Sequence, residues 1–182
     1  MPARLPESLR LDELKTPIGT ALLLTDGEGV LRALDWQEFA DRVHREVRLH
    51  YGGADIRPGR APGGIRKALS AYFGGDLAAV DAIPVAAEGT PFQQKVWAAL
   101  RRIPVGATLS YSALAKKIGH PAAIRAVGLA NGANPISVVV PCHRVIGADG
   151  TLTGYGGGLP RKRWLLAHEG AAFVEQPIRR RA

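Results

Sequence analysis

The first half of the chain opens with two short apolar runs followed by a helical repeat. The runs at 20–25 and 30–34 flank Asp-Gly-Glu-Gly, a turn sequence, and this arrangement predicts a β-hairpin. Apolar side chains then recur at every fourth position from Phe39 to Tyr51, which predicts an amphipathic helix over 36–51. This order of elements favours a small α/β unit.

The apolar pattern is then interrupted by one segment and returns in one further helix. The segment 52–64 is rich in glycine and proline and is expected to be a loop. A second short helix is expected over 65–73, ended by Gly74 and Gly75. No reactive group gathers in this half, so we interpret residues 1–88 as a supporting α/β domain.

A helix-start signal opens the second half, which we assign as a second domain over 89–173. The sequence Thr-Pro-Phe-Gln at 90–93 places Thr at the N-cap, Pro at the first helical position and Gln at the third, as in a capping box. Two short helices are expected next, at 111–118 and 122–130, joined by a turn that contains glycine. Two helices so joined have the outline of a helix-turn-helix, although any compact helical hairpin looks similar.

The helix at 122–130 is unusual for a reader of the DNA major groove. It carries one long polar side chain, Arg125, among many small residues, whereas base edges are usually read by several Arg, Lys, Asn or Gln side chains. Small residues instead allow a close approach of the backbone, which is typical of minor-groove binding. The alternative for Arg125 is a solvated charge on an exposed helix face.

The most informative stretch surrounds the single cysteine. The β-branched run at 136–140 predicts a buried strand stopped by Pro141, and Cys142 follows, beside His143 and Arg144. Cationic neighbours lower the pKa of a thiol and raise its reactivity, so this context predicts a reactive cysteine. The alternative is a buried structural cysteine, because free cysteine is among the most buried residue types.

Composition limits the possible binding partners and the cellular compartment. The 182 residues carry a net charge of +8, which favours a nucleic acid partner. One cysteine excludes an internal disulfide and a multi-cysteine zinc site, and it fits a reducing compartment. No apolar run approaches a membrane span, so no membrane partner and a cytoplasmic location are expected. The basic tail at 174–182 is expected to be disordered.

Five sequence blocks together carry a family resemblance. They are Arg-Ala-Val-Gly at 125–128, Asn-Gly-Ala-Asn-Pro at 131–135, Pro-Cys-His-Arg-Val at 141–145, Gly-Tyr-Gly-Gly-Gly-Leu at 154–159 and Leu-Leu-Ala-His-Glu-Gly at 165–170. In this order they resemble the methylated-DNA–protein-cysteine methyltransferases, also called O6-alkylguanine-DNA alkyltransferases. The resemblance covers roughly residues 90 to 170; the first half matches only loosely.

The resemblance implies a fold, a reaction and a partner. The fold would pair a ribonuclease-H-like α/β domain with a mostly helical, winged-helix-like domain that contains the helix-turn-helix. The reaction would move an alkyl group from O6-alkylguanine, flipped out of double-stranded DNA, to the protein in a single turnover; O4-alkylthymine is left open as a further substrate. The chain would bind DNA in the minor groove as a monomer, with no metal and no cofactor.

The resemblance also assigns the catalytic residues. Cys142 would accept the alkyl group, with His143 as proton acceptor through a bridging water and Glu169 orienting His143. Tyr111 would help to rotate the DNA backbone and donate a hydrogen bond near the reacting guanine. Asn134 would tie the turn between the recognition helix and the cysteine segment.

The remaining residues implied by the resemblance bind DNA or line the substrate pocket. Arg125 would intercalate in place of the flipped nucleotide, and the carbonyl groups of Cys142 and Val145 would read its amino group. In many members Ser or Arg follows the loop tyrosine, but here Gly156 follows it, which suggests a roomier pocket. The other residues of the DNA face are Tyr111, Ala123, Ala126, Gly128 and Ala130, and those of the pocket are Tyr155 and Gly157.

Three alternatives remain open at the level of sequence. A non-catalytic sensor of alkylated DNA would lack the acceptor cysteine, whereas Cys142 is present. A helix-turn-helix transcription regulator would not explain the cysteine motif. A cysteine hydrolase using Cys142, His143 and Glu169 would turn over an acyl substrate and would not need the basic helical hairpin.

Overall fold

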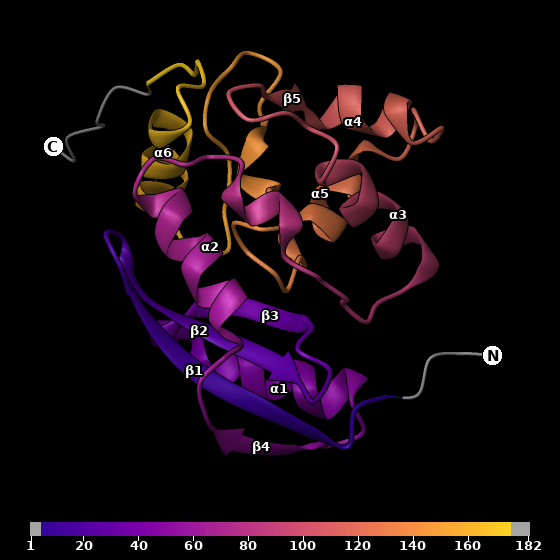
Figure 1. Ribbon diagram of the computed structural model, residues 1–182. Coiled ribbons are helices and arrows are strands. Elements are labelled where there is room, and N and C mark those ends of the chain that lie inside the picture. Colours follow the sequence, from indigo (N-terminus) through magenta and orange to yellow (C-terminus); the bar gives the residue numbers. More distant parts are fainter. Residues whose placement is uncertain (1–4, 176–182) are drawn as a thin grey trace, which may run out of the picture.

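The computed structural model describes residues 5–175, in which a four-stranded sheet precedes a mainly helical half (Figure 1). The regular elements in chain order are β1 (Ser8–Thr16), β2 (Gly19–Asp26), β3 (Leu31–Trp36), η1 (Gln37–Phe39), α1 (Ala40–His50), β4 (Asp55–Pro58), α2 (Gly63–Phe73), η2 (Ala79–Ala82), α3 (Pro91–Leu100), β5 (Leu109–Ser110), α4 (Tyr111–Lys117), α5 (Ile124–Gly132), η3 (Cys142–Arg144), β6 (Val145–Ile146) and α6 (Leu159–His168). The chain is therefore mixed α/β, as the sequence predicts.

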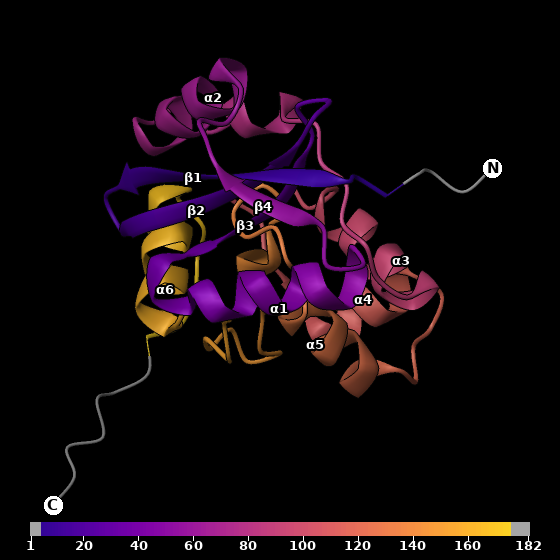
Figure 2. The same ribbon diagram turned by 90° about the horizontal axis from the view of Figure 1, so that it is seen from below.

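The sheet has the strand order β3-β2-β1-β4. The first three strands pair antiparallel and β4 pairs parallel to β1. Figure 2 shows α1 on one face of the sheet and α2 on the other. Because successive side chains on a strand point to opposite faces, Leu22 and Leu24 pack with Val43 and Val47 of α1, whereas Leu23 joins the core on the other face.

The predicted hairpin and both predicted helices of the first half are confirmed, but the loop prediction is wrong in part. β2 and β3 form the hairpin, and the Asp26 carboxylate closes its turn by accepting the N–H groups of Glu28 and Val30. Within 52–64, however, β4 adds a parallel strand to β1. Neither strand has a clear apolar alternation: β1 buries only Leu9 and Leu14, so its pairing depends on neighbours distant in sequence.

The second half begins as predicted, with a complete capping box on α3. The Thr90 hydroxyl accepts the Gln93 N–H at 3.2 Å, and the Gln93 side chain accepts the Thr90 N–H at 2.9 Å. Such a cap contributes about 1 kcal/mol to helix stability. α4 and α5 follow as the predicted pair of short helices, and β5 and β6 form a small parallel pair beside α4.

One hydrophobic core joins the two halves. It includes Leu23 and Leu34 of the sheet together with Trp97, Val127 and other apolar residues of the helical half. The outer edge of β3 is also covered, because the Leu34 N–H donates to the Pro135 carbonyl and the Leu34 carbonyl accepts from a backbone N–H of the same later segment. Pairing of this edge prevents it from recruiting another chain, and it holds the cysteine segment against the sheet.

The predicted strand at 136–140 is wrong. Only Ile136 forms an isolated bridge, with Leu34, and the backbone then turns, with Val138 in the left-handed region at a φ of 69°. A β-branched residue there is strained by about 1–3 kcal/mol. Asn134 stabilises the turn, since its side chain accepts the Ile136 N–H and donates to the Val140 carbonyl. The run is β-branched because it is buried, and burial does not require a strand.

The end of the described chain is held to the body. The Val174 N–H donates to the Gly150 carbonyl at 2.8 Å, and the Glu175 carboxylate accepts from Arg163. The rest of the predicted tail, 176–182, lies outside the described residues. Within 5–175 no helix is long and apolar enough to cross a membrane.

Candidate active site

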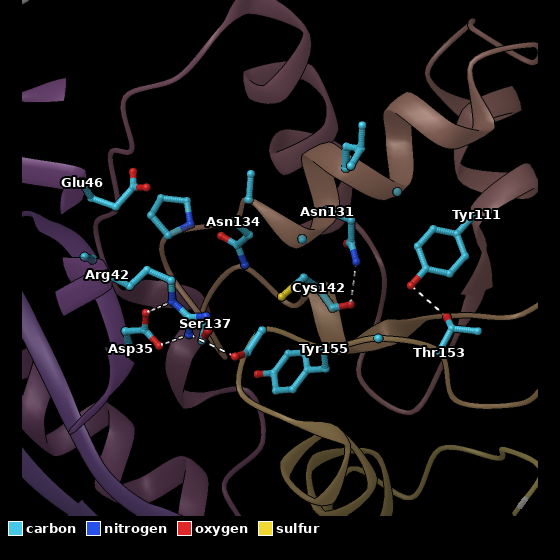
Figure 3. A pocket seen from close by; sticks show the side chains of 18 of the residues that line it. Asp35, Arg42, Glu46, Tyr111, Asn131, Asn134, Ser137, Cys142, Thr153 and Tyr155 are labelled. Atoms are coloured by element: carbon cyan, nitrogen blue, oxygen red, sulfur yellow. Dashed lines mark hydrogen bonds and ion pairs between the residues drawn. The ribbon is translucent and has the colours of Figure 1, made fainter. Parts of the chain in front are cut away.

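Cys142 lies at the wall of a cavity of about 750 Å³ between the two halves of the molecule. The cavity is bounded by α1, α4, α5 and the loop at 153–156. Figure 3 shows Tyr111 on one side of Cys142 and Arg42 with Asp35 on the other. The cysteine is 5% exposed, so its sulfur is buried from bulk solvent yet opens to a space large enough for a nucleobase.

The environment of the thiol differs from the sequence prediction. Burial raises the pKa of Cys142, and this effect outweighs the hydrogen bond from Asn134 and the charge of Lys162, which favour the thiolate. Arg144 does not lie against the sulfur, because its guanidinium binds Glu169 and the Ile103 carbonyl. The thiol therefore keeps its proton in the free protein, and its activation requires a base.

A buried carboxylate organises the groups behind Cys142. Glu169 is 5% exposed, and its two oxygens accept hydrogen bonds from Tyr72 at 2.7 Å, His143 at 2.9 Å and Arg144 at 2.9 Å. Burial opposes its ionisation, but hydrogen bonds from His143, Arg144 and Tyr72 outweigh burial and hold the pKa of Glu169 well below its usual range. The structure thus brings Cys142, His143 and Glu169 into one region, as expected.

His143 is held as a neutral base. An ionised carboxylate only accepts hydrogen bonds, so Nε2 of His143 carries the hydrogen toward Glu169 and Nδ1 carries a lone pair. Burial lowers the pKa of His143, in spite of Glu169, so the ring is neutral at pH 7. Nδ1 is buried and meets no hydrogen-bond partner among residues 5–175. The segment from Cys142 to Arg144 is a 3₁₀ turn, and no direct hydrogen bond joins Cys142 to His143 in the described chain.

Sequence reasoning missed a buried lysine beside the site. Lys162 is fully buried, and its ammonium group donates to the carbonyls of Val145 at 2.7 Å and Thr153 at 2.9 Å. Burial lowers its pKa to about 8. In the sequence it stands between Arg161 and Arg163 and resembles part of a solvated charge run, so no local signal distinguishes it.

The predicted DNA-facing residues gather on α4 and α5, with one exception. Arg125 is exposed at the rim of the cavity, and the Tyr111 hydroxyl accepts a hydrogen bond from Thr153 at 3.0 Å. Gly128 lies beside the Tyr111 ring. Ala130, by contrast, is 3% exposed and faces the core, where its carbonyl accepts from a tryptophan.

The other two alanines of this group stay accessible on the same helix region. Ala126 is exposed and Ala123 is half-buried at the start of α5. Leu129 of α5 is 71% exposed and also lines the cavity, a feature that the sequence did not single out. The accessible face of α5 is therefore apolar apart from Arg125, and it carries two large side chains, Ile124 and Leu129, beside the small Ala126 and Gly128.

The predicted pocket loop divides into lining and packing residues. Tyr155 and Gly156 line the cavity, and burial raises the pKa of Tyr155, which stays a neutral phenol. Gly157 instead packs against Trp36, where an added Cβ would lie 2.7 Å from the indole nitrogen. Val145 is fully buried, and its carbonyl, predicted to read a guanine amino group, accepts from the lysine.

The first half contributes to the cavity wall as well. Asp35, Arg42, Arg45 and Glu46 all line it, although the sequence indicated only a supporting domain. No group of three or more His, Cys, Asp or Glu side chains that could hold a metal ion occurs in the part of the chain described.

The buried imidazole predicts a pH-dependent stability. In the unfolded chain His143 has its ordinary pKa of 6.5, whereas burial lowers that pKa in the folded chain. The folded chain therefore takes up this proton only at lower pH. Below pH 6.5 the unfolded state therefore binds more protons, and stability falls as the pH drops, by at most about 1.4 kcal/mol per pH unit for this group. Urea unfolding at pH 7.0 and 5.5 measures the loss.

The variant His143→Gln removes this proton uptake, so its stability is expected to change less over the same interval. The matched control is His44→Gln, an exposed histidine, which should retain the wild-type pH dependence. Equal pH dependence in wild type and His143→Gln would contradict the neutral, buried assignment.

Comparison with known proteins places this geometry in a family. Residues 91–171 match the family model described as the DNA-binding domain of 6-O-methylguanine DNA methyltransferase. The methylated-DNA–protein-cysteine methyltransferase of Salmonella typhimurium is 50% identical over 161 residues, 87% of this chain and 94% of that protein. The one from Mycobacterium bovis is 57% identical over 156 residues, 86% of this chain and 89% of that protein.

A solved structure agrees with these sequence matches. The crystal structure of Mycobacterium tuberculosis OGT in complex with DNA has a TM-score of 0.76 and 44% identity, covering 88% of this chain and 92% of that one. These matches cover 86–88% of the chain and so extend over both halves, and the range 91–171 of the family model contains Cys142 and Glu169. This chain belongs to the methylated-DNA–protein-cysteine methyltransferase family.

Proposed function

We propose that this chain repairs DNA directly, by transferring the alkyl group of O6-alkylguanine to the sulfur of Cys142. The observation that carries the proposal is a cysteine at a nucleobase-sized cavity, backed by a neutral histidine that an ionised Glu169 holds in place. This is the arrangement of a nucleophile, a base and an orienting acid. Family membership supports the same reaction.

The chemical step follows from the proton positions. His143 takes the thiol proton at Nδ1 through a bridging water, and the resulting imidazolium is stabilised by Glu169. The thiolate attacks the alkyl carbon, a sulfur–carbon bond forms, and the bond from that carbon to O6 breaks with its electron pair passing to the guanine. The Tyr111 hydroxyl donates toward the developing charge. The thioether is stable, so each molecule acts once.

Substrate access requires base flipping, because an alkyl group inside a duplex cannot reach a sulfur at the wall of a cavity. Flipping costs on the order of a few kcal/mol in stacking and pairing. Arg125, exposed at the cavity rim, is placed to fill the vacated space, and the small residues of α5 permit close contact with the minor groove. The DNA face would then comprise Tyr111, Ala123, Arg125, Ala126 and Gly128.

We also propose a fold type for each half of the chain. The order β3-β2-β1-β4, with only β4 parallel, supports a ribonuclease-H-like first half. The helices α4 and α5 beside the β5–β6 pair support a helix-turn-helix of winged-helix type. We propose that the protein binds double-stranded DNA as a monomer and works in the cytoplasm, since its single cysteine must stay reduced.

The decisive experiment follows the alkyl group by mass. The protein is incubated with a duplex that contains one O6-methylguanine, digested, and analysed by mass spectrometry. We expect one methyl group per molecule, located on the Cys142 peptide, and none in Cys142→Ala. Unmodified protein that still binds damaged DNA selectively would support the sensor alternative instead, and repeated turnover of an acyl ester would support a hydrolase.

The glycine at 156 predicts acceptance of bulky alkyl groups. A Cβ at Gly156 would lie 3.6 Å from the Arg42 guanidinium, an ordinary contact, so Gly156→Ser is compatible with the backbone and takes up space in the cavity. We expect the wild type to react with O6-benzylguanine as well as O6-methylguanine in DNA. Gly156→Ser should slow the benzyl transfer more than the methyl transfer in single-turnover assays.

A matched control is Gly27→Ser, in the exposed hairpin turn, where nothing lies within 4 Å of an added Cβ. It should leave both rates unchanged. Negligible benzyl transfer by the wild type would contradict the roomy pocket.

A further inference from the structure

Two arginines hold the carbonyl groups of the pocket loop. Nη2 of Arg42 donates to the Gly156 carbonyl at 3.0 Å, and Nη1 of Arg161 donates to the Gly157 carbonyl at 3.0 Å. Gly156 lines the cavity beside Tyr155, so these bonds fix the part of the loop that faces the substrate. Glycine-rich backbone needs such restraints, because its intrinsic conformational freedom is large.

Arg42 is itself fixed by the first half of the chain. Its guanidinium makes two hydrogen bonds to Asp35, at 2.5 and 2.6 Å, and lies 4.3 Å from the centre of the Phe39 ring. Asp35 in turn accepts the N–H of Trp36 at 2.8 Å, on the strand β3. A two-point contact of this kind sets the direction of the guanidinium, and the second hydrogen of Nη2 then donates to the Gly156 carbonyl.

Arg161 is anchored to the same half of the chain. It donates to the Ile18 carbonyl at 2.8 Å, pairs with Glu38 at 2.5 Å and lies 4.5 Å from the centre of the Trp36 ring. The loop is therefore attached to the sheet at two successive carbonyls. Figure 3 shows the Arg42 side of this attachment, with Asp35 and Arg42 at the cavity wall near Cys142.

We propose that Asp35 and Arg42 are positioning residues that set the alkyl selectivity of the pocket by holding the Gly156 carbonyl. The proposal rests on the function proposed above and assigns to the first half a role in substrate choice. Arg42 acts through the loop and does not touch the reacting atoms. Without it the loop widens and loses the geometry that suits a methyl group, while a bulky group, which needs the extra width, is affected less.

The test compares single-turnover rates on duplexes that contain O6-methylguanine or O6-benzylguanine. Arg42→Gln should lower the methyl rate roughly tenfold, since small displacements of positioning groups have effects of this size. The benzyl rate should fall less, so the ratio of benzyl to methyl rates rises. Asp35→Asn, which weakens the hold on Arg42, should shift the ratio in the same direction by a smaller factor.

Arg66→Gln is the matched control. Arg66 pairs with Asp12 at 2.5 Å, and the side chains are 22% and 10% exposed, close to the 32% and 10% of the Arg42–Asp35 pair. The Arg66 pair does not line the cavity, so its loss should lower stability comparably and leave the rate ratio at the wild-type value. A general loss of stability therefore cannot imitate the expected result.

The outcomes separate this proposal from the function it rests on. If the wild type forms no adduct at Cys142, the proposed function fails. If the wild type reacts and Arg42→Gln keeps the wild-type ratio, the positioning role is overturned. A fall in affinity for undamaged DNA with an unchanged ratio would likewise overturn it, because Arg42 would then be a phosphate contact. Arg42→Lys retains the positive charge but lacks the planar guanidinium that binds Asp35 at two points. If the proposal holds, its ratio of benzyl to methyl rates should lie between those of the wild type and Arg42→Gln.

Discussion

The structure depends on one buried carboxylate. An ionised Glu169 away from water is tolerated only if hydrogen bonds and an opposite charge surround it, and here Tyr72, His143 and Arg144 supply both. These donors come from α2 and from η3, while Glu169 itself ends α6. The carboxylate thus joins three parts of the fold at a single point, and one of its partners, His143, directly follows Cys142 in the chain.

This arrangement assigns opposite protonation states to neighbouring groups. Arg144 neutralises Glu169, so the carboxylate does not need His143 to be charged, and burial keeps the imidazole neutral. Burial also keeps the Cys142 thiol protonated. In the proposed mechanism the proton moves from sulfur to His143 when a substrate is in place, and the resulting imidazolium faces the ionised Glu169. A thiol that stays protonated until then is protected from oxidation and adventitious alkylation.

Local features were predictable from sequence, and long-range contacts were not. The hairpin at Asp26, the capping box at Thr90 and the short helices each depend on neighbouring residues, and all are found in the structure. The strand expected at 136–140 was wrong because burial and strand formation produce the same β-branched composition.

The candidate site likewise contains residues that the local sequence predicts and long-range contacts that it does not. The cysteine motif predicted Cys142 as the nucleophile and His143 as its partner, because those residues are adjacent in sequence. Tyr72 meets Glu169 across 97 positions, and Arg42 meets Gly156 across 114, so no local pattern could reveal either contact. Lys162 was missed for a related reason: only its burial distinguishes it from its basic neighbours.

The measurement that tests this account most directly is the rate of alkyl transfer to Cys142 in Glu169→Gln, on an O6-methylguanine duplex in single-turnover conditions. The neutral amide cannot stabilise the imidazolium, so we predict a fall of roughly 100-fold, the lower range for loss of general base catalysis, with affinity for undamaged DNA unchanged. A transfer rate equal to that of the wild type would show that the buried carboxylate serves only the fold, and would contradict the account.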